Sequence, residues 1–199
     1  MIKAIFFDLG GVLFTNGTKK LVAYIANKYN LDEELIKNLI DVGDLPNAYR
    51  EGKIKREVFW TRVKATLQFT ESVDEIEQRW ISGYELISGT KDIIGKLAKK
   101  YDVYFLSDNV KDRVEAVNNR FDFISWFTDG VFSHEVGVRK PNPEIYKIAL
   151  KKAQVTPTEA VFIDDNPKLL IPAKKMGILT FLFETPNKLL DDLEASHLL

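Results

Sequence analysis

The 199-residue chain contains no cysteine, and this absence removes several kinds of chemistry. A chain without cysteine has no disulfide, no thiolate metal site and no cysteine nucleophile. Long apolar runs are absent too, because no stretch approaches the roughly 20 residues that a membrane-spanning helix needs. The first apolar run also meets Asp8 too early to be a signal peptide. We therefore expect a soluble, cytoplasmic protein with no membrane partner.

An excess of charge of one sign is also missing. The chain has 28 basic and 29 acidic residues, which gives a formal net charge of -1. No basic stripe indicates a nucleic-acid partner, and the paired lysines are typical of solvated helix surfaces. The length allows one domain, or a core domain with a small insertion. We expect a monomer or a weak homodimer.

The first apolar run ends at an acidic residue. Ile5-Phe6-Phe7 leads into Asp8, and Gly10 and Gly11 follow. In an open parallel sheet, ligands bind beyond the carboxyl ends of the strands. An acid at that place can act as a nucleophile or as a metal ligand. Alone the pattern is weak, because an ordinary turn after a strand has the same composition.

Two later segments have the same form, and a cation lies between them. The apolar run of residues 102–106 precedes Ser107-Asp108-Asn109, and that of residues 160–163 precedes Asp164-Asp165-Asn166. Lys140 lies in a loop just before a helix that Pro143 opens. These patterns predict buried strands whose polar residues gather at one edge of a sheet.

The periodicity of the chain changes after Leu13 and again near Ser88. Between these points the apolar spacing is helical, and it predicts a cap of four helices. Residues 41–53 are the least regular part of this cap. This segment could contact the substrate, or it could simply connect two helices. From Thr90 onward helices alternate with strands, which predicts a doubly wound parallel α/β sheet. We predict a core domain of residues 1–16 and 86–199 and a helical-bundle cap of residues 17–85.

The ordered set of Asp8, Ser107, Lys140 and Asp164-Asp165 resembles the four motifs of the haloacid dehalogenase-like hydrolase superfamily. The resemblance extends over nearly the whole chain and favours the branch with a helical cap after the first strand. It implies a Rossmann-like core and a magnesium-dependent phosphatase. The expected substrate is a small phosphorylated metabolite, such as a sugar phosphate, cleaved through an aspartyl phosphate on Asp8. A dehalogenase is disfavoured, since that chemistry needs no acidic metal site.

The resemblance also implies a role for each motif residue. Asp8, Ser107 and Lys140 are the expected catalytic residues. The magnesium ligands are expected among Asp8, Asp165, the backbone carbonyl of Gly10 and Asp164, the last in direct or outer-shell support. The expected phosphate-binding residues are Gly11, Ser107, Asp108, Asn109 and Lys140. Three structural alternatives stay open at this point. Ser107 and Asp108 could cap the next helix, Asp164 and Asp165 could be acids at a helix N-terminus, and Lys140 could be a surface lysine.

Gly10 departs from the family pattern. Phosphatases of the family usually carry an aspartate at this position, where it protonates the leaving group and later activates water. Glycine has no proton to give, and general acid-base catalysis contributes about 10²–10⁴-fold in rate. The alternative function is therefore a catalytically weakened protein that binds phosphate or a partner. The candidate replacements for the missing acid are Asn16, His134, Asp41, Asp44 and Glu51.

Overall fold

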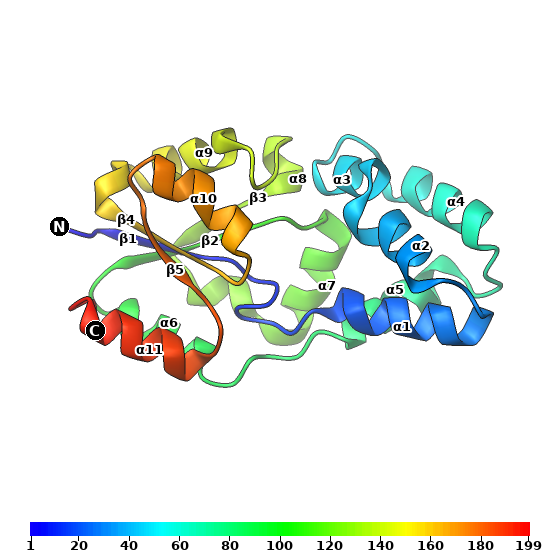
Figure 1. Ribbon diagram of the computed structural model, residues 1–199, viewed down its shortest axis with the longest axis horizontal. Helices are drawn as coiled ribbons and strands as arrows, with labels where there is room; N and C mark the ends of the chain where they lie inside the picture. Colours follow the sequence, from blue (N-terminus) through cyan, green and yellow to red (C-terminus); the bar gives the residue numbers. More distant parts are fainter.

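The computed structural model describes residues 1–199 and is built around a five-stranded parallel sheet with helices on both faces (Figure 1). The strand order is β3-β2-β1-β4-β5. The strands are β1 Ala4–Phe7, β2 Asp102–Ser107, β3 Asp129–Phe132, β4 Ala160–Asp164 and β5 Leu179–Leu182. Most of their residues are apolar and buried, as expected for a sheet covered on both faces. The predicted doubly wound, Rossmann-like α/β fold is confirmed.

The register of the central strands brings the motif residues to one edge. Phe7 at the end of β1 pairs with Phe105 of β2 and with Ile163 of β4. Because the strands are parallel, the residues that follow this level leave the sheet at the same edge. Asp8, Ser107 and Asp164 therefore lie beside one another, although the sequence separates them widely.

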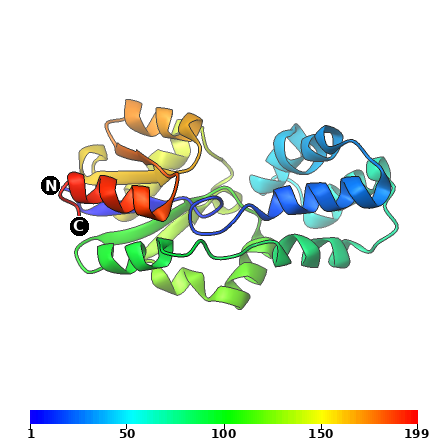
Figure 2. The same ribbon diagram turned by 60° about the horizontal axis from the view of Figure 1, so that its bottom comes forward.

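Two apolar clusters cover the two faces of the sheet, because side chains alternate along each strand. Phe6 and Phe162 point to the face covered by α9 (Pro143–Ala153) and α10 (Pro167–Lys175). Ile5 and Ile163 point to the opposite face, where α6, α7 and α11 pack. The other core helices are α6 Thr90–Leu97, α7 Lys111–Phe121, α8 Ser133–Val136 and α11 Pro186–Ala195, with 3₁₀ turns at Phe123–Trp126 and Pro157–Glu159. The layers are visible in Figure 2.

Residues 17–82 form a separate group of helices at the end of the molecule opposite the two termini (Figures 1 and 2). They are α1 Gly17–Tyr29, α2 Glu33–Lys37, a π-helical turn Asn38–Val42, α3 Asp44–Arg50, α4 Arg56–Leu67 and α5 Val73–Ser82. Trp60 and Trp80 are buried among them with their ring centroids 6.1 Å apart. None of the helices in the structure is both long and apolar enough to cross a membrane.

The expectation of four cap helices was wrong, because five α-helices and a π-helical turn lie within residues 17–82. Residues 41–53 include the end of the π-helical turn and the whole of α3. Most of that segment is regular, since Asn38–Val42 is π-helical and α3 follows at once. Pro46 lies in the first turn of α3, where the backbone N–H groups have no partner inside the helix. This proline is therefore compatible with the helix.

Two linkers join the cap to the core, and they run side by side. Phe14 and Leu86 form an antiparallel bridge, and the N–H of Thr15 donates to the carbonyl of Glu85 at 2.8 Å. One apolar cluster continues from the sheet past Phe14 and Tyr84 into the cap. We propose that residues 1–16 and 86–199 form the core domain and residues 17–85 the cap domain.

Two glycines test the packing of the core. A Cβ atom at Gly130 of β3 would lie 2.2 Å from the ring of Phe105, whereas a Cβ atom at Gly95, inside α6, meets nothing within 4 Å. We expect Gly130→Ala to destabilise the protein by about 1–3 kcal/mol through overpacking. Gly95→Ala, the matched control, should stabilise it by about 0.5–1 kcal/mol. Urea unfolding monitored by circular dichroism measures both, and equal effects would contradict the packing described here.

Candidate active site

The predicted motif residues meet at the carboxyl edge of the sheet. The backbone N–H of Asp8, just after β1, donates to the carbonyl of Ile163 at 2.8 Å, which fixes Asp8 beside β4. Ser107 ends β2 and is buried, and Asp164 ends β4 and is fully buried. Lys140 reaches the same place from the loop that precedes α9. Asp8, Ser107, Lys140 and Asp165 all line one cavity.

The ammonium group of Lys140 is the centre of this arrangement. Its side chain is 1% exposed, and Nζ lies 2.8 Å from Oδ1 of Asp8 and 2.7 Å from Oδ2 of Asp164. A buried charge is tolerated only when opposite charges and hydrogen bonds compensate its loss of hydration. Burial opposes the charge on Lys140, but Asp164 and Asp8 overcome this effect and raise its pKa above the ordinary value. The alternative of a solvated surface lysine is wrong.

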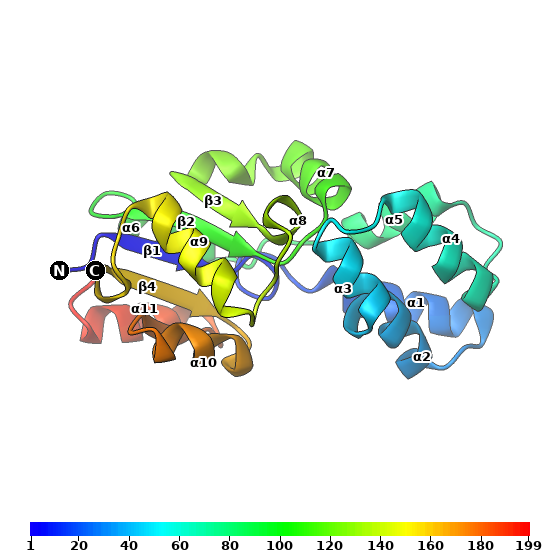
Figure 3. The same ribbon diagram turned by 90° about the horizontal axis from the view of Figure 1, so that it is seen from above.

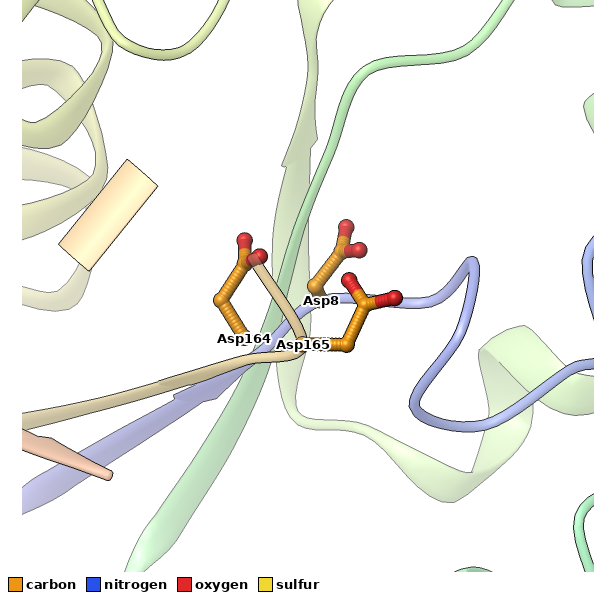
Figure 4. A group of neighbouring side chains, drawn as sticks. All are labelled: Asp8, Asp164 and Asp165. Atoms are coloured by element: carbon orange, nitrogen blue, oxygen red, sulfur yellow. The ribbon is translucent and has the colours of Figure 1, made fainter. Parts of the chain in front are cut away.

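Three carboxylates form a compact acidic cluster in Figure 4. One oxygen from each of Asp8, Asp164 and Asp165 lies within 4.8 Å of the others. In Figure 4 the carboxylates of Asp164 and Asp165 lie to either side of that of Asp8, and only Asp165 of this pair lines the cavity. Three carboxylates against the one Lys140 ammonium leave two formal negative charges, and carboxylate oxygens suit a hard divalent cation. The cluster therefore fits an ion such as Mg²⁺.

Burial is also the largest influence on the pKa values of Asp8 and Asp165. It raises the pKa of Asp8, the charge of Asp164 adds to this effect, and Lys140 opposes it. The pKa of Asp165 is raised by partial loss of water contact and then by its neighbour Asp164. A bound cation would act against both shifts, because it favours the ionised carboxylates. This is a second reason why the site fits a metal ion.

Gly11 allows the chain to pass close to the cluster. Its φ is +84°, and a Cβ atom there would lie 2.0 Å from Oδ2 of Asp165. Any side chain at this position would displace the carboxylate. Gly10, its neighbour, lines the cavity and lacks a positive φ, and a Cβ atom added to it would meet nothing within 4 Å. The two adjacent glycines therefore have different roles.

The polar residues after β2 do not cap the next helix. Val110 is the N-cap of α7, and no side chain accepts a hydrogen bond there. Asp108 instead accepts the backbone N–H of Lys140 at 3.0 Å and pairs with Arg139 at 3.5 Å, so it supports the lysine loop. Asn109 lines the cavity, and its N–H donates to Oγ of Ser133 at 3.1 Å.

The acids after β4 are not helix caps either. Asn166 is the N-cap of α10, and its side chain accepts the N–H of Lys168. Oδ1 of Asp164 accepts the N–H of Asn166 at 2.9 Å, which orients the buried carboxylate for Lys140. Asp165 makes no ion pair within the chain and faces the cavity.

A cavity of about 260 Å³ lies between the edge of the sheet and the cap. Figure 3 shows how α3 and α5 of the cap approach α8 and α7 of the core around this edge. Of the candidate replacements for the missing acid, Asn16 and Asp41 line the cavity, whereas Asp44 and Glu51 do not. His134 does not line it either. Its Nδ1 contacts the carbonyl of Asn109 at 2.9 Å.

Two arginines also line the cavity. Arg50, in the segment that the sequence suggested for substrate contacts, binds the carboxylate and the backbone carbonyl of Asp41. Arg113 of α7 was not predicted. The sequence offered one indication that Arg113 lies near the site. Arg113 follows Asn109 by four residues, and side chains with this spacing come close together along a helix. That signal is common in sequences and does not by itself indicate a site.

Residues 2–177 match the family model of haloacid dehalogenase-like hydrolases. The D-ribitol-5-phosphate phosphatase of Bacteroides thetaiotaomicron is 27% identical over 188 residues, which cover 91% of this chain and 91% of that enzyme. The phosphorylated carbohydrates phosphatase of Thermotoga maritima is 29% identical over 188 residues, 89% of this chain and 82% of that enzyme. A mutant of a haloacid dehalogenase-family enzyme from B. thetaiotaomicron, crystallised with magnesium and inorganic phosphate, has a TM-score of 0.79. It is 25% identical, and the match covers 93% of this chain and 95% of that one.

The buried ion pairs of Lys140 predict a pH-dependent loss of stability. In Lys140→Met, Asp8 and Asp164 stay buried without their cation, so we expect a loss of about 3–5 kcal/mol near pH 8. Lys140 lowers the pKa of Asp8, whereas burial raises it, so without Lys140 this pKa lies further above that of the unfolded chain and the folded state binds more protons. The loss should therefore grow as pH rises and shrink towards pH 5.

Urea unfolding at pH 5 and pH 8, without divalent cations, measures this difference. Lys174→Met is the matched control, because Lys174 is exposed on α10, and it should change stability little at either pH. A loss for Lys140→Met that is the same at both pH values would contradict the electrostatic explanation.

Proposed function

This chain belongs to the haloacid dehalogenase-like hydrolase family, and from that membership we propose that it is a magnesium-dependent phosphatase of a small phosphorylated metabolite. The observation that carries the proposal is the position of Asp8. This carboxylate lines the cavity, is held by Lys140 and lies beside two further acids. Two relatives with matches over most of their length are named as phosphatases of phosphorylated carbohydrates. A sugar phosphate or a polyol phosphate is therefore the proposed kind of substrate.

Asp8 and Asp165 are the proposed side-chain ligands of Mg²⁺, with the backbone carbonyl of Gly10. Asp164 supports these ligands without binding the ion itself, because its oxygens already bind Lys140 and the N–H of Asn166. When bound, the ion neutralises charge on the phosphoryl oxygens, which would otherwise repel an attacking carboxylate. The acidic cluster and its excess of negative charge support this assignment.

Asp8 is the proposed nucleophile. Its carboxylate attacks phosphorus, a new P–O bond forms, and the bond to the leaving alcohol oxygen breaks. Water then attacks the phosphorus of the aspartyl phosphate, which releases inorganic phosphate and restores Asp8. Lys140 holds Asp8 in place through Oδ1 and balances charge, and the hydroxyl of Ser107 donates to a phosphoryl oxygen.

The leaving alcohol needs a proton, and Gly10 cannot supply one. Asp41 is the one acid of the cap that lines the cavity, but its carboxylate binds Arg50. The transition state of phosphoryl transfer is loose in most analyses, so positioning and charge stabilisation can carry much of the rate. The proposed activity is therefore slow on poor leaving groups. The missing carboxylate also favours a second candidate function, a protein that binds phosphate or a partner with little turnover.

Removal of the nucleophile tests the proposed activity. Phosphate release from a panel of sugar and polyol phosphates should require Mg²⁺ and stop when the ion is chelated. Asp8→Asn should abolish turnover while the fold persists, because the amide is nearly isosteric but a poor nucleophile. Asp92→Asn, on the exposed face of α6, is the control and should retain full activity. Turnover by Asp8→Asn at the wild-type rate would overturn the assignment.

Restoring the missing carboxylate tests the role of Gly10. This position has open space and no positive φ, so Gly10→Asp should fold without strain. The new carboxyl should raise kcat by up to about 10²–10⁴-fold for alkyl phosphates, whose departure needs a proton. Aryl phosphates with activated leaving groups should gain less.

Steady-state kinetics over a series of leaving groups, with circular dichroism as the fold check, measures the effect. Gly95→Asp, an exposed helical position outside the cavity, is the matched control. A folded Gly10→Asp variant with unchanged rates for every leaving group would mean that another group already supplies the proton.

A further inference from the structure

The cavity between sheet and cap is lined by seven charged residues, and not all of them form ion pairs within the chain. They are Asp8, Asp41, Arg50, Asp108, Arg113, Lys140 and Asp165. Five of them take part in ion pairs within the chain: Lys140 pairs with Asp8, Arg50 with Asp41, and Asp108 with Arg139. The two others are an acid and a base. Asp165 belongs to the acidic cluster, whereas Arg113 takes part in no ion pair of the structure.

Arg113 is nevertheless buried, with 8% of its surface exposed. Its guanidinium carbon lies 3.6 Å from the ring centroid of Trp80, so the cap covers one face of the group. Nη1 donates to Oδ1 of Asn109 at 3.4 Å, which is longer than the usual range of about 2.7–3.2 Å. Arg113 thus has a neutral, distant acceptor and an aromatic neighbour. Glu77 and Asp112 line a small pocket beside it, but neither carboxylate forms an ion pair with it.

A buried guanidinium without a carboxylate is costly, because neither the ring nor the amide replaces its lost hydration. Trp80 contributes a cation–π contact and shields one face from water. This shielding strengthens the attraction between the guanidinium and any anion that enters the cavity. The planar fork of arginine also matches the two oxygens of a carboxylate or phosphate group.

We propose that Arg113 binds a second anionic group of the substrate, so that the substrate carries a carboxylate or phosphate remote from the phosphoryl group that is cleaved. This inference rests on the proposed phosphatase function and narrows its substrate class. Asp8, Ser107 and Lys140 hold the cleaved group at the ends of the strands. Arg113 lies where α7 meets α5 of the cap, so it faces the remainder of the substrate.

The middle of the cavity suits a chain of hydroxyl groups between the two anions. Asn16, Thr18, Asp41 and Tyr84, which have polar side chains, are among its lining residues. The hydroxyl of Thr18 also accepts the indole N–H of Trp80 at 3.1 Å, which fixes the ring that covers Arg113. The proposed substrate class is therefore a polyhydroxylated phosphate with an acidic group at its other end.

Three substrates of equal length test whether a second anion is recognised and which kind it is. They are a five-carbon polyol monophosphate, the corresponding aldonate phosphate with a terminal carboxylate, and the polyol bisphosphate. Arg113→Met keeps the length of the side chain and removes its charge. We expect it to lower kcat/KM about 10- to 100-fold for the compounds with a second anion, since a hydrogen bond to a charged group is lost. The loss should appear mainly in KM. The polyol monophosphate, which has no second anion, should lose much less.

Two further variants separate charge recognition from cap support. Arg113→Lys keeps the charge without the planar fork, so its selective loss should be smaller. Arg120→Met is the matched control, because Arg120 lies on the same helix, donates to the cap carbonyls of Ile81 and Tyr84, and does not line the cavity. It should leave the ratio between the three substrates unchanged. The compound most affected by Arg113→Met identifies the second anion as carboxylate or phosphate.

A binding measurement keeps this test independent of turnover. Calorimetry with the Asp8→Asn variant gives Kd for the same three compounds, with and without the added Arg113→Met change, and circular dichroism confirms folding. Selective weakening for the two compounds with a second anion supports the inference, even if no substrate releases phosphate and the proposed function fails. Equal weakening for all three compounds, or no weakening in Arg113→Met and Arg113→Lys, would overturn it.

Discussion

The burial of one ammonium group is the constraint on which the rest of the site depends. Lys140 is compensated only if Asp8 and Asp164 meet it from the ends of two neighbouring strands. That requirement fixes the loop before α9, and Asp108 holds this loop by its backbone. Because a buried charge without a partner is costly, errors in the placement of these segments destabilise the fold itself. The groups of the site are therefore held by the same interactions that stabilise the core.

The cap is joined to this rigid edge by polar and aromatic contacts rather than by apolar packing alone. Trp80 of the cap stacks on Arg113, which reaches Asn109 beside Ser107. A second connection runs from the carbonyl of Arg50 through the hydroxyl of Ser133, which also accepts the N–H of Asn109. Both connections end on the loop after β2. The segment that follows Ser107 is thus linked to the cap at two places.

Most of the core was predictable from the sequence, because short apolar runs followed by polar residues are a strong local signal. The register of the parallel strands then brings Asp8, Ser107 and Asp164 together without further information. The cap was less predictable. A π-helical turn has no simple sequence pattern, and the short helix α3 follows it after a single residue. Arg113 was missed for another reason. The contact of Arg113 with Trp80 joins residues 33 positions apart, on α7 and α5, and no local pattern encodes it.

The paired linkers have a mechanical consequence. Thr15 and Glu85 are hydrogen-bonded across the two chains that enter and leave the cap, and Ile87 is bonded back to Leu13. The two linkers therefore attach the cap as one hydrogen-bonded, two-stranded ribbon, and not as two independent flexible segments. A ribbon bends readily across its flat face and resists both bending in its own plane and stretching. We expect the helices of residues 17–82 to rotate as a rigid body about a single hinge axis at the linkers, so that the cavity opens and closes by one motion.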